Sequence, residues 1–196
     1  MSGWRRQRTW RGGWRDAITW GLLLIGMLIL GEGLAMGAKA KLGQWLIQQA
    51  WQTKQRGEEA APPWPWADTR PVARLEVPAH GVDLIVLAGG TGHTLAWGPG
   101  HLAGTAPVGA AGNAVIGGHR DTHFSFMRRI EAGAEIRTED TDGRSRVYYV
   151  TESYVTHERD AQVLAPSNDA QLTLVTCWPF DTPVPGGPER YVVVAR

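Results

Sequence analysis

Hydrophobic residues dominate one long stretch near the start of the chain. Residues 17–38 read AITWGLLLIGMLILGEGLAMGA, and Glu32 is the only charged side chain among them. A helix rises by about 1.5 Å per residue, so a stretch of this length is enough to cross a hydrocarbon layer roughly 30 Å thick. The pattern therefore predicts a transmembrane helix over residues 17–38.

The next segment, residues 39–56, has a different pattern. Its positions at helical spacing are Leu42, Trp45, Leu46 and Gln49, with Ile47, Ala50 and Trp51 beside them. This spacing predicts an amphipathic helix that leads away from the membrane and packs on a following domain. A plain continuation of the anchor helix would give the same spacing.

Residues 57–70 interrupt this helical pattern. The stretch GEEAAPPWPWADTR holds three prolines, and Pro71 follows directly, so regular structure is not expected there. We interpret it as a linker. Large aromatic rings are unfavourable in water, so we expect Trp64 and Trp66 to pack on the domain.

Beyond residue 70 the hydrophobic period changes to two. β-branched and aromatic runs alternate with Gly, Pro, Asn and Asp, which is typical of short strands. The predicted strands are 72–77, 82–87, 114–118, 146–155, 171–176 and 190–196. Only HFSFMRRIEAG, residues 123–133, looks like a short helix or turn. The absence of long intervening helices predicts a mainly antiparallel β-barrel or sandwich over residues 71–196.

Charge divides the chain unevenly between its two parts. Residues 1–56 hold nine of the twenty Lys and Arg residues but only two acids, whereas residues 57–196 hold eleven basic and seventeen acidic residues. The predicted β domain is therefore acidic, which argues against nucleic acid as a partner.

The basic residues of the first part cluster in residues 1–16. This tail contains Arg5, Arg6, Arg8, Arg11 and Arg15. Basic residues beside a span stay in the cytoplasm, so everything after residue 40 is expected on the outer side of the membrane. The nearby aromatic residues suit the headgroup zone; they are Trp4, Trp10, Trp14 and Trp20.

A cleaved signal peptide is an alternative for the same segment. Glu32 limits the uninterrupted apolar run to residues 17–31, and Ala38-Lys39-Ala40 is a tolerable cleavage site. With either interpretation the β domain is exported.

The chain has a single cysteine, Cys177, at the end of the apolar run QLTLVT. It has no second cysteine for an internal disulfide, so it is either an inert buried residue or a reactive one. His119 favours reactivity. It follows Gly117 and Gly118, which would let the backbone bend so that the imidazole faces a cleft. A histidine near a cysteine can hold the pair partly as thiolate and imidazolium and then protonate a departing amine.

Arg190 is a third candidate. Acyl transfer develops negative charge on a carbonyl oxygen, and a fixed guanidinium can stabilise that charge. On a final strand, Arg190 could equally be ordinary surface charge. His123 is another candidate, although it could equally be a plain hydrogen-bonded histidine. The remaining histidines are interpreted as ordinary ones: His80, His93, His101 and His157.

The segment TLVTC, residues 173–177, resembles the TLxTC strand-end motif of sortases, the membrane-anchored cysteine transpeptidases. The order of parts is also similar: an N-terminal anchor, a histidine after GH, a cysteine about sixty residues later and an arginine on the next strand. The phrases LAWGPGHLAGTAPVG, GNAVIGGHRDTHF and CWPFDTPVPGGPERYVVV resemble the sortases of Gram-negative bacteria in particular. The similarity extends from about residue 40 to the C-terminus.

This resemblance implies an eight-stranded β-barrel with the active site at one rim, preceded by a transmembrane helix and a helical stalk. His119, Cys177 and Arg190 would be the catalytic residues. The cysteine would attack an LPxTG-like sorting signal of an exported protein, and an amine acceptor would then resolve the thioacyl enzyme without ATP. The enzyme would sit in the bacterial inner membrane with its catalytic domain outside the cytoplasm.

Three further residues receive substrate-binding roles under this interpretation. Thr176 could hydrogen-bond near the thiol, Trp178 and Phe180 could wall an apolar groove, and His123 could contact substrate. Phe180 is better explained by packing. We expect no cofactor and no metal, because three acids in one turn (Glu139, Asp140 and Asp142) are ordinarily just solvated.

Three other functions fit parts of the same sequence. His119, Asp121 and His123 alternate, so on a strand they could form a metal site with Cys177; the glycines and the composition RDTHF favour a turn instead. A binding module with an inert Cys177 is a second possibility. A peptidoglycan L,D-transpeptidase is a third, but its usual Ser/His-Gly-x-Cys phrase is missing from LVTCW.

Overall fold

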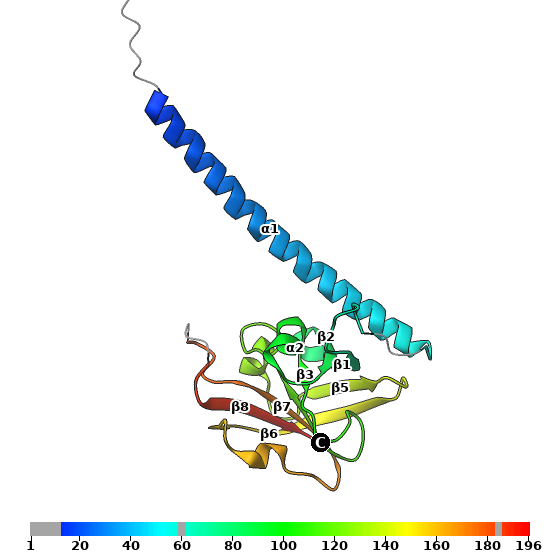
Figure 1. The fold of residues 1–196 in the computed structure, drawn as a ribbon. Helices are drawn as coiled ribbons and strands as arrows, with labels where there is room; N and C mark the ends of the chain where they lie inside the picture. The colour runs from blue at the N-terminus through cyan, green and yellow to red at the C-terminus, as the bar shows by residue number, and fades with distance from the viewer. Residues whose placement is uncertain (1–12, 59–61, 183–185) are drawn as a thin grey trace, which may run out of the picture. The chain divides into compact units, whose positions relative to one another are not determined.

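The computed structural model describes residues 13–58, 62–182 and 186–196. The arginines at positions 5–11, with Trp4 and Trp10, lie outside these ranges. The chain divides into two compact units, Met1–Leu42 and Gly43–Arg196. Helix α1, Gly13–Gln55, belongs to both, and it is one unbroken helix through the predicted span and the predicted amphipathic segment (Figure 1).

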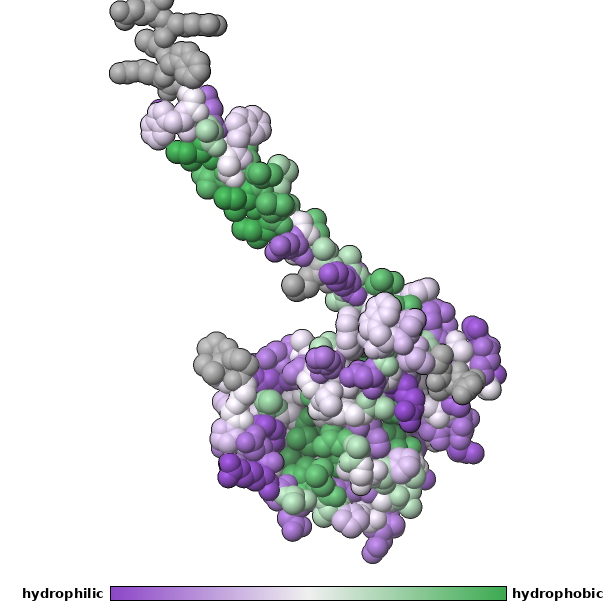
Figure 2. Space-filling model, viewed as in Figure 1, coloured by the Kyte–Doolittle hydropathy of each residue, from purple (hydrophilic) through white to green (hydrophobic). Residues whose placement is uncertain are grey.

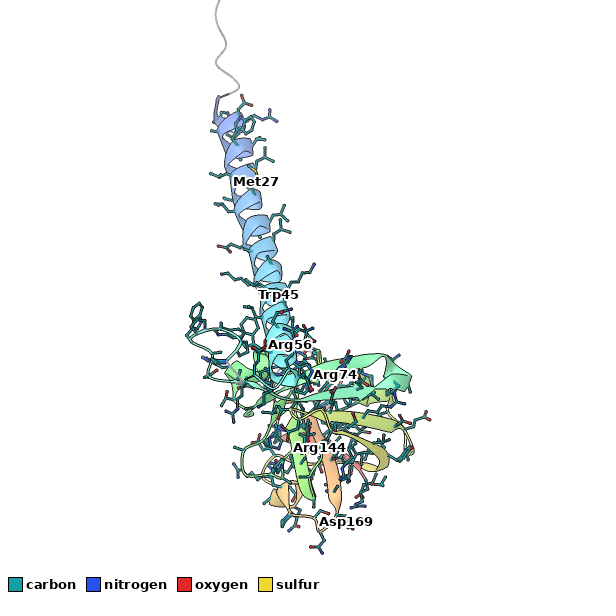
Figure 3. All side chains as sticks on the ribbon, turned by 90° about the vertical axis from the view of Figure 1, so that its right-hand side faces the viewer. Met27, Trp45, Arg56, Arg74, Arg144 and Asp169 are labelled. Carbon is teal, nitrogen blue, oxygen red and sulfur yellow. The ribbon has the colours of Figure 1, made fainter. Side chains whose placement is uncertain are left out.

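The part of α1 in the first unit is covered with exposed apolar side chains. The large apolar side chains described between Trp14 and Leu34 are all exposed. Figure 2 shows the hydrophobic stretch, and Met27 within it is labelled in Figure 3. An isolated helix that is apolar on all sides needs an apolar environment. Helix α1 is long and apolar enough to span a membrane.

Eight strands close into a barrel in the second unit. The strand order around the barrel is β1-β2-β3-β4-β7-β8-β6-β5 (Figure 1). The strands are β1 Pro71–Val77, β2 Val82–Ala88, β3 Gly100–His101, β4 Gly112–Gly117, β5 Glu135–Asp140, β6 Ser145–His157, β7 Ala170–Cys177 and β8 Glu189–Ala195. The predicted eight-stranded barrel is therefore confirmed. The pairs β2–β3 and β4–β7 are parallel, and the other pairs are antiparallel.

Short helices connect the strands. They are α2 Gly92–Trp97 and the 3-10 helices η1 Pro78–His80, η2 Ser125–Arg129 and η3 Ala161–Leu164. Helix η2 lies in the segment that the sequence predicted as a short helix or turn. It inserts Phe126 and Met127 into the core.

Alternating side chains of the strands fill the barrel. On β1 every second residue is buried, from Pro71 to Val77. On β7 the inward residues Leu172 and Leu174 are fully buried, and they join the main core with Phe124 and Tyr148. Period-two alternation buries one face of each strand, which is why β-branched and aromatic runs form this fold.

The end of α1 packs on the barrel and belongs to the same unit. Ile47 and Trp51 are buried against Ile85 and Leu87 of β2. The side chain of Gln55 donates a hydrogen bond to the carbonyl of Asp140 at 3.0 Å. The predicted helix that packs on the domain is therefore present, as the last turns of α1.

Of the two tryptophans in the linker, one packs on the domain and the other is exposed. Trp64 packs edge-on against Trp97, with the ring centroids 4.9 Å apart. Trp66 is 83% exposed, so the expectation that it packs on the domain is wrong. Pro65 and Trp66 form the turn that the Ala67 amide closes on the Trp64 carbonyl at 2.9 Å, and Trp66 is exposed in it.

Candidate active site

Parallel pairing of β4 with β7 brings two distant parts of the chain together at one rim. Gly117 is the register partner of Val175. One residue further, the Gly118 amide donates to the Val175 carbonyl at 3.1 Å, and Thr176 Oγ1 donates to the Gly118 carbonyl at 2.7 Å. The ladder between β4 and β7 ends after these two bonds, while β7 remains paired with β8 as far as Cys177.

Continued by two residues, the same register would bring His119 level with Cys177. Both residues come one position after the last bonded pair, Gly118 with Thr176. His119 is exposed and Cys177 is half-buried. Cys177 is therefore partly accessible at the surface of the barrel, and solvent can reach His119.

Cys177 lies on the outer face of β7. The strand alternates, so Cys177 shares its face with Val175, whereas Leu174 and Thr176 point inward. In Figure 3, Asp169, which directly precedes β7, is labelled at one end of the barrel. Strand β7 runs from that end to Cys177 at the opposite rim.

The loop after β4 holds His119 by its backbone. The amide of Phe124 donates to the His119 carbonyl at 3.0 Å, which closes a turn. The Phe124 ring then lies over Gly118, so that a Cβ at Gly118 would come within 2.7 Å of Phe124 Cγ. Neither Gly117 nor Gly118 has a positive φ. The diglycine thus leaves room for Phe124 and Leu102, and it does not supply the unusual backbone conformation that the sequence suggested.

His123 lies four residues after His119, in the turn that follows β4. It is half-buried, and burial lowers its pKa below the ordinary value; the nearby charge of His119 lowers the pKa further. Together with His80 and Arg129 it lines a groove of about 340 Å³. The lowered pKa favours the neutral form of His123.

Arg190 lies directly opposite Cys177. The two residues are register partners across the antiparallel pair β7–β8, so their side chains share one face. Its Nη1 donates to the carbonyls of Gly187 and Glu189 at 2.7 and 2.9 Å. Its Nη2 donates to Glu158 Oε2 at 2.7 Å. These contacts fix the guanidinium to Glu158 and to the start of β8.

An apolar groove of about 340 Å³ borders this site. Its apolar lining is Leu102, Ala161, Val163, Leu164 and Val175, and its polar lining includes Glu158, Asp160 and Arg190. Figure 2 shows hydrophobic residues gathered over β7 and β8. Because Val175 and Cys177 share a strand face, the groove leads along β7 toward the thiol.

The aromatic residues after Cys177 pack together. Trp178 stacks on Tyr191 with the centroids 5.6 Å apart, and Phe180 meets both rings edge-on. Phe180 is buried, as expected of a packing residue. Trp178 is half-buried, so one part of its ring is accessible beside Cys177.

Thr176 is too deeply buried to contact a substrate. It is 2% exposed, and its hydroxyl is bonded to the Gly118 carbonyl. The side chain therefore supports the backbone next to His119.

The sequence interpretation missed Arg120. This residue is 4% exposed, and its guanidinium donates to the carbonyl of Pro179 at 2.8 Å and to that of Thr182 at 3.1 Å. An arginine in a polar turn ordinarily indicates surface charge, and only the tertiary structure brings these carbonyls to it. The one feature of the sequence that could have pointed to Arg120 is that it directly follows His119.

The described residues include no group of three or more His, Cys, Asp or Glu side chains that could hold a metal ion. The segment after β4 is a turn, so His119, Asp121 and His123 do not share a strand face. In the hairpin between β5 and β6, Arg144 pairs with Asp140 and Asp142 (Arg144 is labelled in Figure 3). These acids are neutralised by arginine.

A comparison with protein families matches the sortase domain to residues 75–196. The chain belongs to the sortase family. Sortase D5 transpeptidase of Clostridium perfringens is 27% identical, with a TM-score of 0.60 over 74% of this chain and 86% of that one. Sortase A of Corynebacterium diphtheriae is 30% identical, with a TM-score of 0.59 over 66% of this chain and 61% of that one.

Sortase A of Listeria monocytogenes is 28% identical, with a TM-score of 0.56 over 64% of this chain and 85% of that one. A comparison with curated protein sequences finds no match. The closed barrel described above is the fold typical of sortases, and the family supports a transpeptidase activity.

Proposed function

We propose that this sortase is a cysteine transpeptidase in which Cys177 is the nucleophile, His119 transfers the proton and Arg190 holds the carbonyl oxygen. The observation that carries the proposal is the end of the β4–β7 ladder, where His119 and Cys177 follow the last bonded pair on one rim. Arg190 faces Cys177 from β8. A thiol, an imidazole and a guanidinium at one accessible rim suit acyl transfer.

The reaction exchanges one amide bond for another. Cys177 Sγ attacks the carbonyl carbon of the scissile peptide bond, and the C–N bond breaks as His119 gives a proton to the leaving amine. The product is a thioester on Cys177. An incoming amine attacks this thioester, the C–S bond breaks, and the proton of the amine returns to His119. The bond energy is kept in the thioester, so ATP is not required.

The grooves on either side of the site accommodate the two substrates. The apolar groove along β7 receives the sorting signal, an LPxTG-like segment of an exported protein, with Trp178 at its end. The groove lined by His80 and His123 admits the amine acceptor.

The N-terminal helix anchors the enzyme. Its apolar stretch is long enough to cross a membrane, and the arginine-rich residues 1–16 favour a cytoplasmic N-terminus. The barrel is then outside the cytoplasm, where exported proteins arrive. The phrases quoted above support a place among the sortases of Gram-negative bacteria.

The test is to incubate the full chain in detergent with candidate sorting peptides and to analyse the protein by mass spectrometry. We expect a thioester adduct on Cys177, which an added amine removes while a new amide product forms. The variants Cys177→Ala and His119→Ala should lack turnover and keep the fold. Full activity of Cys177→Ala would end the proposal.

A further inference from the structure

We propose that Arg120 is a positioning residue, which sets the geometry between His119 and Cys177 by holding the segment that follows the cysteine. The inference rests on the proposed function and adds to it a residue that touches no substrate. We call residues 178–182 the exit segment, because the chain leaves β7 through it.

The contacts of Arg120 join the two sides of the site. Its Nη1 and Nη2 reach two carbonyls of the exit segment, those of Pro179 at 2.8 Å and Thr182 at 3.1 Å. Its Nε lies 3.4 Å from Asp121 Oδ1. The side chain is 4% exposed, whereas that of Asp121 is 68% exposed. A buried guanidinium requires such partners, since a buried charge without them is strongly unfavourable.

Backbone pairing alone does not hold His119 against Cys177. The last bonds between the two strands are those of Gly118 with Val175 and Thr176. Beyond them the chain after β4 turns, whereas β7 continues to Cys177 in its pairing with β8. His119 is thus bracketed by Gly118, held in the ladder, and by Arg120, held to the exit segment. Cys177 is bracketed in the same way by Thr176 and by Pro179.

Arginine suits this position better than lysine. A planar guanidinium presents several N–H groups in a fixed fork, so one side chain can hold two carbonyls in a defined direction. An ammonium group is a point charge on a flexible stem and would hold them less rigidly. Small displacements of reacting groups have large effects on rate.

A second arginine contacts the same segment and provides a matched control. Arg128 of η2 donates to the Phe180 carbonyl at 3.0 Å and pairs with Asp181 at 2.6 Å. Its side chain is 50% exposed, and it is eight positions further from His119 along the chain than Arg120. Arg128 holds the exit segment to η2 and does not join it to the backbone of His119.

The test compares Arg120→Gln, Arg120→Lys and Arg128→Gln in the full chain. The first measurement is the rate at which iodoacetamide alkylates Cys177 in the native state, with His119→Ala as the reference for a missing imidazole. The second is steady-state turnover of a sorting peptide, divided into kcat and KM and corrected by titration of reactive Cys177. Circular dichroism reports the folded fraction.

We expect Arg120→Gln to lower kcat by about 10-fold to 10²-fold with KM within about three-fold, because the apolar groove is untouched. Alkylation should slow toward the rate of His119→Ala. Arg120→Lys should recover part of both rates, and Arg128→Gln should stay within about two-fold of the unmodified protein. If Arg120→Gln does not fold, Arg120→Lys carries the same comparison, with an expected loss of about 3-fold to 10-fold in kcat.

Other results would overturn the proposal. A folded Arg120→Gln that acylates and alkylates within about two-fold of the unmodified protein would assign Arg120 to packing alone. So would a loss of rate that disappears after correction for the folded fraction. If His119→Ala alkylates as fast as the unmodified protein, the pairing of His119 with Cys177 fails, and the proposed function fails with it.

Discussion

Arg190 donates a hydrogen bond from Nη2 to Oε2 of Glu158 at 2.7 Å. Glu158 follows β6, and Arg190 is the second residue of β8. The pair therefore ties the beginning of the β6–β7 connection to the strand that faces Cys177. A guanidinium held in this way is oriented before substrate arrives, which is what stabilisation of developing charge requires.

Replacing Arg190 should have a large effect on catalysis. We expect Arg190→Ala to lower kcat/KM by about 10²-fold or more. Arg190 is the residue of β8 that pairs with Cys177, so its loss removes the guanidinium from that position. Glu158→Gln should lower it by only about 3-fold to 10-fold, since the carbonyls of Gly187 and Glu189 still hold the guanidinium. Steady-state peptide turnover measures both. Nearly full activity of Arg190→Ala would remove Arg190 from the mechanism.

Gly118 is expected to tolerate no side chain. A Cβ there would lie 2.7 Å from Cγ of Phe124, so Gly118→Ala forces the ring to move and should lower the free energy of unfolding by about 1–3 kcal/mol. Gly117→Ala is the control, because its nearest neighbour is the flexible end of Leu102 at 3.3 Å. Denaturant titration measures the difference.

A double variant identifies the cause of this loss. If the Phe124 ring is responsible, Phe124→Leu should cost less in the Gly118→Ala background than alone. Equal costs in both backgrounds would assign the loss to the backbone of Gly118.

His123 should make the protein less stable in acid. Its folded pKa is lowered, first by burial and then by His119, so between the folded and unfolded values the unfolded chain binds more protons. Stability contributed by neutral His123 is complete above the unfolded value of about 6.5. It decreases as the pH falls and levels off below the folded pKa.

The measurement is the unfolding free energy against pH for the unmodified protein and His123→Asn. The variant should have a flatter profile below about pH 6.5. His93→Asn, at an exposed position of α2, is the matched control. An unchanged slope in His123→Asn would show that other groups cause the acid sensitivity.

The end of α1 should contribute strongly to the stability of the barrel. Trp51 is 4% exposed and packs with Ile85 and Leu87, so Trp51→Ala should lower the free energy of unfolding by about 3–5 kcal/mol. Trp66→Ala should change it by no more than about 0.5 kcal/mol, because Trp66 is 83% exposed. Thermal unfolding of the full chain in detergent compares them. Equal effects would contradict the assignment of Gly43–Gln55 to the catalytic unit.

Much of the fold was predictable from the sequence because local patterns carry it. The apolar run at 17–38 and the alternating runs at 72–77, 82–87 and 171–176 are close to observed elements. Strands β3 and β5 were not predicted. Strand β3 is only Gly100–His101, and β5, with the sequence EIRTED, has too few apolar residues to stand out.

The family resemblance, together with the spacing of His119, Cys177 and Arg190, indicated the candidate site. The sequence could not assign the supporting residues. Thr176 was predicted to contact substrate and is buried with its hydroxyl bonded to the Gly118 carbonyl. Arg120 was not singled out and is a buried contact of the exit segment. Such contacts join residues about sixty positions apart, and no local pattern encodes them.

The sequence by itself determined an apolar helix, an acidic β domain and one thiol that cannot form an internal disulfide. Those properties depend on composition and on periods of a few residues, which the chain carries locally. Only the tertiary structure decided that β4 and β7 pair in parallel with a register that aligns Gly118 with Thr176. That register is set by the packing of the whole barrel, and it brings the segments that carry His119 and Cys177 to the same rim.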